Sequence, residues 1–349
     1  MNADNPKPYI QRFLRRTGFF VCAPLLVYLP FGVLFHEQLL ERSKGPNVEK
    51  QILSAFEHAR THDFDLLILG NSRMYRGVNP DRFSVPAFNL AHDDDSFNQM
   101  YYKLRWLEEQ GRGIRFLAMG VDYFQFGVCS DRRNYVYTRL FDPKYAADYP
   151  PVGFFDKRNW VKPGFFNGIN PKHLFADGNG RPFIRENGQY IRPGTASPAD
   201  FVPRDTEKLP LQVNYFERIL QHCRERDITV FLCLLPIRPE EKNAYQEGEI
   251  EKFLAFLKPY LAEDVHLLNF TNAPDFRMND YTDITHLNET AANRFSTLLD
   301  ESICDFIVSP DSRISPDEAI ASPSAVPSKR NETPVHSVSR PRVLPDNDQ

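Results

Sequence analysis

The sequence FDLLILGNSRMYRGVNP, residues 64–80, joins an apolar run to a small polar triplet. Leu66 to Leu69 are all aliphatic, which is typical of a strand that is buried on both faces of a sheet. Gly70, Asn71 and Ser72 end the run, and basic residues follow. The triplet therefore either turns the chain or presents the hydroxyl of Ser72 for chemistry, and the rest of the chain is needed to choose.

Short apolar runs and amphipathic helical patterns alternate along the chain. In the helix predicted at 96–111, Met100, Leu104 and Leu107 share one face, and Asp95 or Ser96 caps the start. Strands that alternate with helices indicate an α/β fold, namely a doubly wound, flavodoxin-like parallel sheet of about five strands with helices on both faces. The predicted strands are 65–70, 87–92, 114–122, 228–237 and 265–270, and further helices are predicted at 211–227, 239–262 and 288–307.

The composition is that of a folded domain without a nucleic-acid footprint. Of the 349 residues, 42% are hydrophobic and 25% are charged, which is an ordinary balance for a globular protein. The net charge of −4 gives no basic face for nucleic acid. Five cysteines show no CxxC or CxH spacing, which argues against a zinc site. Cys223 and Cys233 fall on a predicted helix and the strand after it, where they are either inert buried thiols or a disulfide pair.

The segment from Thr17 to Phe35 contains no charged residue. At about 1.5 Å per residue, a helix of this length comes close to the ~30 Å hydrocarbon thickness of a bilayer. The basic residues before it predict a single-pass anchor in the inner membrane, with the N-terminus in the cytoplasm and the following domain in the periplasm. A cleaved signal peptide and a buried soluble helix are the alternatives. The basic residues are Lys7, Arg12, Arg15 and Arg16.

These patterns divide the chain into three parts. Residues 1–36 form a cytoplasmic stub and the transmembrane anchor, and residues 37–308 form the α/β domain. Residues 125–207 lack helix or strand periodicity and are rich in Pro, Gly and aromatic residues, so we expect an irregular insertion near a pocket. The tail, residues 309–349, has almost no large apolar residues, and we expect it to be disordered.

A second polar motif, NDYTDITHLNETAANRF, precedes the last predicted helix. Asp283 and His286 are three residues apart, so in a helical turn they face the same way. The carboxylate can then hold one imidazole nitrogen while the other activates a serine hydroxyl. Because this loop follows the fifth predicted strand, it lies at the same carboxyl edge of the sheet as Ser72. Placement favours a catalytic triad of Ser72, His286 and Asp283, and the alternative is a turn serine with an unrelated surface pair.

The blocks LLILGNSR and DITHLNETAANRF resemble the first and last motif blocks of the SGNH (GDSL-like) hydrolase superfamily. The THLNE-x-A run and the N-terminal anchor are similar to its membrane-tethered branch, which acts beside membrane-bound O-acyltransferases in the modification of cell-envelope polymers. The resemblance covers residues 64–124 and 210–307. It implies that Ser72 is the nucleophile, His286 the general base and Asp283 the residue that orients the base.

The resemblance also implies an oxyanion hole, and here the chain departs from the family pattern. The family combines the N–H of the serine with a glycine N–H and an asparagine side chain. Ser72 can supply the first donor, but Ala91 stands near the glycine position and Asp122 stands at the asparagine position. A carboxylate repels a developing oxyanion. Asp122 is therefore either protonated or turned away to hold the sheet edge, with Asn71 or Asn89 donating in its place.

Two arginines and an acidic run can each be interpreted either as part of a binding site or as ordinary structural residues. Arg73 and Arg76, together with the two asparagines named above, could contact an anionic substrate, or the arginines could be solvated loop residues. The run His92–Asp95, HDDD, could bind a metal, but carboxylates are favoured at a helix N-terminus in any case. We expect no metal. The aromatic residues of 154–166 either stack on sugar rings or pack locally.

Together these features predict a membrane-anchored, extracytoplasmic SGNH-type serine esterase or O-acyltransferase. It would move or remove an acyl group on a cell-envelope glycan through an acyl-serine intermediate, without a metal or an organic cofactor. The expected partners are the membrane, an acylated glycan or acyl donor, and a multi-pass membrane-bound O-acyltransferase, with no nucleic acid. The alternative is a catalytically weak or inactive SGNH-fold partner of such an acyltransferase, which Asp122 favours.

Overall fold

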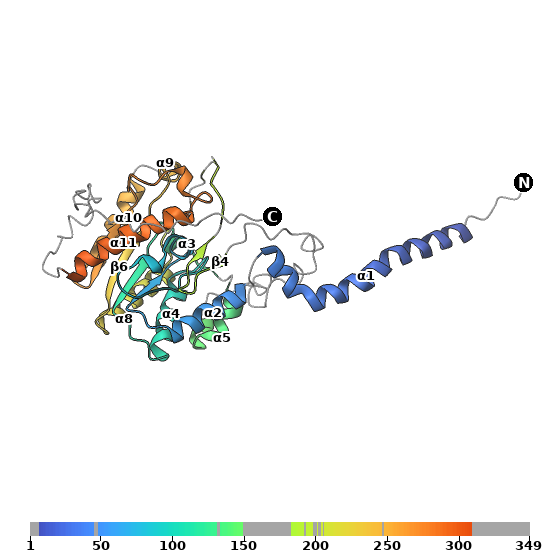
Figure 1. The fold of residues 1–349 in the computed structure, drawn as a ribbon, viewed down its shortest axis with the longest axis horizontal. Coiled ribbons are helices and arrows are strands. Elements are labelled where there is room, and N and C mark those ends of the chain that lie inside the picture. The colour runs from blue at the N-terminus through green and yellow to red at the C-terminus, as the bar shows by residue number, and fades with distance from the viewer. Residues whose placement is uncertain are drawn as a thin grey trace, which may run out of the picture.

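The computed structural model of the 349-residue chain is described here for residues 7–44, 48–130, 133–148, 183–191, 193–197, 201, 204, 206–245 and 248–308. Figure 1 shows an α/β domain from which one long N-terminal helix extends. The predicted tail at 309–349 and the aromatic run at 154–166 lie outside the described residues.

Five parallel strands form the central sheet in the order β2-β1-β3-β6-β7. The prediction of a flavodoxin-like parallel sheet is therefore confirmed. Leu67 of β1 pairs in register with Phe88 of β2 and with Leu117 of β3. The next two strands in the chain therefore lie on opposite sides of β1, which makes this the point where the strand order reverses. Residues that follow such a strand meet at one crevice of the sheet edge. The strands are β1 Leu66–Leu69, β2 Ala87–Asn89, β3 Phe116–Gly120, β6 Thr229–Leu234 and β7 Val265–Asn269.

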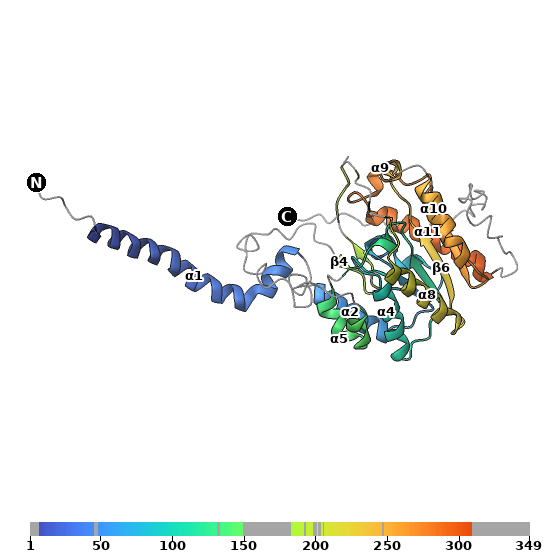
Figure 2. The same cartoon turned by 180° about the vertical axis from the view of Figure 1, so that it is seen from behind.

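Two layers of helices cover the sheet, and Figures 1 and 2 show them from opposite sides. Alternate residues of β1 serve the two layers: Leu67 and Leu69 pack with α2, α4, α8 and α10, whereas Leu66 and Ile68 pack with α3 and α11. This alternation explains why the whole strand is apolar. The helices are α2 Val48–Thr61, α3 Ser72–Gly77, α4 Phe97–Glu109, α8 Pro210–Arg224, α10 Glu249–Leu257 and α11 Glu289–Val308.

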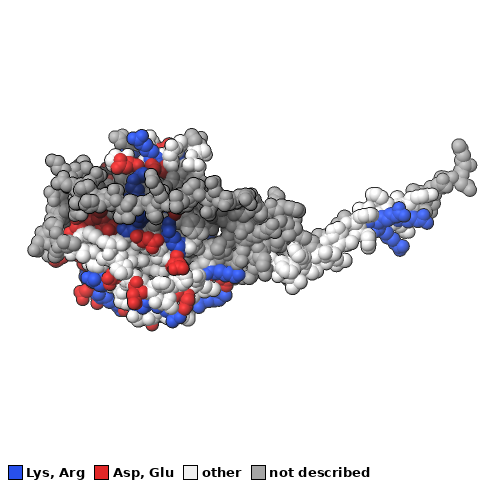
Figure 3. Space-filling view, in the orientation of Figure 1, with Lys and Arg blue, Asp and Glu red and all other residues white. Residues whose placement is uncertain are grey.

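The N-terminal helix α1, Lys7–Lys44, contains Pro24 and Pro30 and projects away from the domain in both views. Its described large apolar side chains are exposed, among them Phe19 and Leu26. Figure 3 shows basic residues near its N-terminal end and uncharged residues along the rest of its described surface. Within the portion of the chain whose placement is described, no helix is both long enough and apolar enough to span a membrane.

The irregular insertion predicted at 125–207 contains short regular elements among its described residues. Short helices and a two-stranded antiparallel sheet occur there, each too short for its periodicity to be recognised in the sequence. The hairpin of β4 and β5 lies against the edge strand β2, where the N–H of Asn89 donates to the carbonyl of Asn187 at 2.9 Å. The elements are η2 Gln125–Gly127, α5 Asn134–Leu140, α6 Lys144–Ala147, β4 Phe183–Ile184 and β5 Tyr190–Ile191.

The single helix predicted at 239–262 is divided into α9, Pro239–Ala244, α10, and η5, Lys258–Tyr260. Gly248, which precedes α10, has φ +81°, a left-handed conformation that glycine adopts without cost. The remaining short elements are η1, Pro80–Arg82, and η6, Met278–Asp280.

The cysteines of α8 and β6 are free thiols, so the disulfide alternative for them is wrong. Cys223 packs in the cluster that contains α4 and α8, whereas Cys233 packs in the cluster that contains α3 and α11. The two thiols therefore face opposite sides of the sheet. Burial raises the pKa of both, to about 12 for Cys223 and further for Cys233, as expected of inert core thiols.

Candidate active site

The turn between β1 and α3 consists of Gly70 and Asn71, and Ser72 is the first residue of α3. Gly70 has φ +156°, and a Cβ atom there would lie 2.4 Å from Cγ of Met74, so the close approach of α3 requires glycine. Asn71 caps α3, because its Oδ1 accepts the N–H of Arg73 at 2.9 Å. The triplet thus turns the chain and also begins a helix with Ser72 at the carboxyl edge of the sheet.

Asp283 shapes the loop that carries His286. Its Oδ1 accepts the N–H groups of Thr285 and His286, each at 3.0 Å, and the N–H of Thr282 donates to the carbonyl of His286 at 2.8 Å. The pair therefore meets across a turn closed by the aspartate, rather than across the helical turn that we predicted. Arg238, which follows β6, donates to the carbonyl of Asp283 at 3.2 Å and fixes the loop to the sheet edge.

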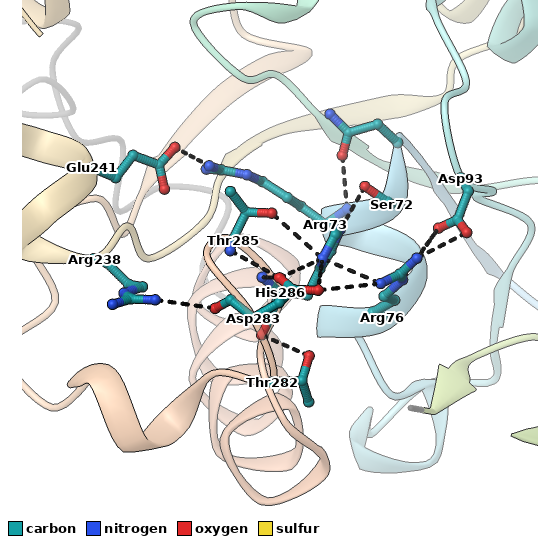
Figure 4. Close-up of polar contacts among 11 residues, drawn as sticks. Ser72, Arg73, Arg76, Asp93, Arg238, Glu241, Thr282, Asp283, Thr285 and His286 are labelled. Carbon is teal, nitrogen blue, oxygen red and sulfur yellow. Dashed lines mark hydrogen bonds and ion pairs between the residues drawn. The ribbon is translucent and has the colours of Figure 1, made fainter. Parts of the chain in front are cut away.

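Ser72, His286 and Asp283 form a continuous hydrogen-bonded chain, shown in Figure 4. Oγ of Ser72 lies 2.8 Å from Nε2 of His286, and Nδ1 of His286 lies 2.8 Å from both carboxylate oxygens of Asp283. The carboxylate can only accept, so Nδ1 carries the proton and Nε2 is free to accept the serine hydroxyl. This is the arrangement that activates a serine nucleophile.

The surroundings keep the aspartate charged and favour a neutral imidazole. Burial lowers the pKa of His286, against the opposing effect of its hydrogen bond to Asp283. Burial tends to raise the pKa of Asp283, but the hydrogen bonds from His286 and from two backbone N–H groups outweigh it and hold that pKa far below its usual range. A neutral imidazole beside a fixed carboxylate is competent to take a proton at neutral pH.

Asp122, which follows β3, is held away from any oxyanion role. It is 2% exposed, accepts from Nδ2 of Asn71 at 2.7 Å and pairs with the guanidinium of Arg73 at 3.3 Å. In both contacts the partner donates a hydrogen bond to the carboxylate. The expectation that this residue supplies an oxyanion donor is therefore wrong, and the structural alternative, in which it holds the sheet edge, describes its contacts.

The other expected oxyanion donors are also engaged within the protein. The N–H of Ala91 donates to Oδ1 of Asn89 at 3.0 Å. Nδ2 of Asn89 donates to the carbonyls of Met74 and Val78, each at 2.9 Å, so this side chain holds the end of α3. These two expectations are corrected because the donors satisfy buried acceptors. The N–H of Ser72 has no acceptor among the described residues.

Asn71 and Arg73 belong to a buried network rather than to a substrate site. Nδ2 of Asn71 also donates to Oε1 of Gln125 at 2.6 Å. Arg73 pairs with Glu241 of α9 as well as with Asp122, and its side chain is 2% exposed. Burial alone would lower the pKa of Arg73, but these two carboxylates raise it well above its ordinary value. Their assignment as substrate contacts is therefore wrong, because both residues are buried and their polar groups bind other residues of the domain.

Arg76, in contrast, does lie at the triad. Its guanidinium is 3.2 Å from Nδ1 of His286 and 3.7 Å from Oδ2 of Asp283. Asp93 binds the same guanidinium with both carboxylate oxygens, so Arg76 is not free to receive a substrate anion. The sequence offered Asp93 only as one member of an acidic run, because its arginine partner lies on another element.

The acidic run HDDD does not assemble a metal site. Asp93 pairs with Arg76, and Asp95 pairs with Lys103 at 2.5 Å. In the part of the chain that the structure describes, no group of three or more His, Cys, Asp or Glu side chains is placed to hold a metal ion.

Comparisons with known proteins add little to this geometry. A family model without a descriptive name matches residues 205–308, which include Asp283 and His286 but not Ser72. No curated protein matches the chain. A solved structure from Streptococcus pneumonia, described as a candidate platelet activating factor, is similar with a TM-score of 0.38 and 11% identity, covering 80% of this chain and 99% of that one. At this level of similarity the neighbour says nothing about the activity of this chain.

Proposed function

We propose that the α/β domain is a serine esterase or O-acyltransferase that works through an acyl-serine intermediate. The observation that carries the proposal is the contact of 2.8 Å between Oγ of Ser72 and Nε2 of His286, with Asp283 on the other imidazole nitrogen. A serine hydroxyl is a weak nucleophile at neutral pH and gains reactivity from such a base. Ser72 lies on α3, whereas Asp283 and His286 lie on the loop before α11, so the contact between the serine and the histidine is a property of the fold.

The three residues have distinct roles in the proposed reaction: nucleophile, general base and acid, and the residue that orients the base. Nε2 of His286 takes the hydroxyl proton while Oγ of Ser72 forms a bond to the acyl carbonyl carbon. The imidazolium, stabilised by Asp283, then gives its proton to the departing alkoxide as the ester C–O bond breaks. In the second half, water or a sugar hydroxyl gives its proton to His286 and its oxygen bonds to the acyl carbon. The Oγ–C bond breaks, and the proton returns to Ser72.

We further propose an SGNH-type lineage, an acylated cell-envelope glycan as substrate and an extracytoplasmic location on a membrane. The placement of GNS after β1 and of DITH before α11 supports the lineage. The uncharged segment from Thr17 to Phe35 within α1 supports the location, because basic residues precede it on the same helix. A multi-pass membrane-bound O-acyltransferase is the proposed partner and would supply or receive the acyl group.

One observation favours a second candidate, in which the domain is a catalytically weak or inactive partner of the acyltransferase. Asp122 is a buried carboxylate in an ion pair, and the N–H of Ala91 is bonded within the protein. Among the described groups that we assigned to the oxyanion hole, only the N–H of Ser72 is unbonded. Loss of one oxyanion donor costs about 10²–10³ in rate, so a slow enzyme or a scaffold is a coherent reading.

A labelling experiment on the full chain separates the two candidates. We expect an alkyl fluorophosphonate to modify wild-type protein at Ser72 and p-nitrophenyl acetate to be hydrolysed, with the rate in Ser72→Ala lower by on the order of 10³-fold or more. Ser54→Ala, an exposed serine on α2, is the matched control and should retain the wild-type rate. Equal rates for wild type and Ser72→Ala, with no labelling, would overturn the enzyme and favour the scaffold.

A further inference from the structure

Asp93 has no role in the steps of the proposed reaction, yet it binds a residue that lies beside the triad. It follows β2 in the loop that leads to α4, and its side chain faces α3. Its Oδ1 accepts from Nε of Arg76 at 3.2 Å and from the NH2 group at 3.0 Å, and its Oδ2 accepts from the NH2 group at 2.9 Å. Such a two-pronged pairing fixes the orientation of a guanidinium as well as its place.

The free end of the same guanidinium faces the aspartate–histidine pair. Its NH1 group lies 3.2 Å from Nδ1 of His286 and 3.7 Å from Oδ2 of Asp283. The β4–β5 hairpin holds Arg76 from the other side: Nε2 of Gln189 donates to its backbone carbonyl at 3.0 Å, and the ring of Tyr190 lies 5.2 Å from the guanidinium carbon. Because the side chain is 12% exposed, its charge is weakly screened by water.

In this placement Arg76 and His286 could both bind the carboxylate of Asp283, and Asp93 prevents that competition by binding Arg76. A guanidinium without a partner would pair with Asp283 and draw that carboxylate away from the imidazole. It would also oppose the positive charge that His286 gains when it takes the serine proton. With two of its nitrogens bound by Asp93, Arg76 remains near the pair, and the two opposite charges largely cancel at the imidazole.

We propose that Asp93 is a positioning residue: it retains Arg76 beside the imidazole and so leaves Asp283 free to orient His286. The consequence for turnover rests on the proposed function, whereas the consequence for the imidazole does not. The charged groups that face His286 are Arg76 from α3, Asp93 from the loop after β2, and Asp283 from its own loop. The neutral hydroxyls of Ser72 and Thr285 complete its described polar surroundings.

The test compares two variants that should shift the pKa of His286 in opposite directions. A general loss of structure would not produce opposite shifts. In the full chain, Asp93→Asn should lower the pKa of His286 by about 1, because Arg76 then acts on it unopposed, and Arg76→Gln should raise it by a similar amount. The double variant should return close to the wild-type value. The measurement is the NMR titration of ¹³Cε1-labelled histidine, with the His286 signal assigned by its loss in His286→Gln.

A second measurement follows the reaction. The pH dependence of fluorophosphonate labelling should shift in parallel, since labelling requires the neutral base. The midpoint of its acid limb should move to lower pH in Asp93→Asn and to higher pH in Arg76→Gln. The plateau rate should fall at least about tenfold in Asp93→Asn as Asp283 is diverted. Asp63→Asn, which removes the exposed partner of Arg112, is the control and should change neither value.

The outcomes distinguish this inference from the proposed function. Single variants that shift the pKa of His286 in the same direction, or a double variant that fails to restore it, would overturn the role of Asp93. If wild-type protein is not labelled at Ser72 but the opposite shifts are observed, the proposed function fails while the positioning of the imidazole stands.

Discussion

At the scale of single residues, the site depends on how each charge is paired. Arg73 and Arg76 are one turn apart on α3, yet they serve different purposes. The guanidinium of Arg73 points into the buried network of Asp122 and Glu241, whereas that of Arg76 points toward His286. An arginine with carboxylates on two elements fixes those elements relative to each other. The nucleophile turn is therefore braced by β3 and α9.

Replacing Asp122 tests whether this brace or the oxyanion hole is its role. We expect Asp122→Asn to lower the free energy of unfolding by about 1–3 kcal/mol, because an amide facing both Asn71 and Arg73 can accept through only one atom. We expect no gain in hydrolysis of p-nitrophenyl acetate. Urea unfolding and initial rates provide the measurements. A tenfold faster variant would instead mean that the carboxylate had been opposing the oxyanion.

The residues that carry the triad could be predicted from sequence, whereas the oxyanion hole could not. Ser72 and His286 follow parallel strands of a doubly wound sheet, so topology places both at its carboxyl edge. Since β3 and β6 lie between β1 and β7, the loop after β7 must cross that edge to reach Ser72. The contacts of Asp122 depend on Glu241, which is 119 positions further along the chain and belongs to α9. No local pattern in a single sequence records such a partnership.

At the scale of elements, the sequence predicts β1 best, because this buried strand is a continuous apolar run bounded by polar residues. The strand predicted at 87–92 ends at Asn89, where the apolar run is interrupted. The β4–β5 hairpin was missed because strands of two residues leave no period to detect. It nevertheless contributes to the site, since Gln189 and Tyr190 contact Arg76. Its fit against β2 depends on Gly188, where a Cβ atom would lie 1.9 Å from the carbonyl oxygen of Asn89.

Gly188→Ala should release the hairpin from β2, because both the clash and the left-handed φ of +102° oppose a side chain there. We expect faster amide hydrogen exchange in 183–191 and a lower labelling rate at Ser72, with most of the sheet unaffected. Gly111→Ala is the matched control: its φ of +73° is also left-handed, but its added Cβ would meet no atom within 4 Å. Equal exchange in the two variants would show that the contact with Asn89 does not hold the hairpin.

At the scale of the whole molecule, the chain combines a compact α/β domain with one helix that the domain does not cover. The described apolar side chains of α1 lie in solvent, where Phe20 is 75% and Leu26 73% exposed. Burying such a surface in the interfacial region or core of a bilayer is favourable by roughly 25 cal/mol per Å² of apolar area. Arg12, Arg15 and Arg16 precede the uncharged segment in the sequence, and anionic headgroups would attract them. Figure 3 shows basic residues near the N-terminal end of α1.

Membrane attachment is tested most directly by placing a charge on this helix. We expect the full chain to float with vesicles of anionic phospholipid in a density gradient and Leu26→Asp to shift a large part of it to the soluble fraction, since an aspartate at the centre of an apolar segment costs about 2.5–3.5 kcal/mol. Leu53→Asp, on α2 and 41% exposed, is the control and should still float. Loss of flotation in both variants, or in neither, would separate α1 from membrane binding, and the proposed membrane location would then need a different explanation for the exposed apolar side chains of α1.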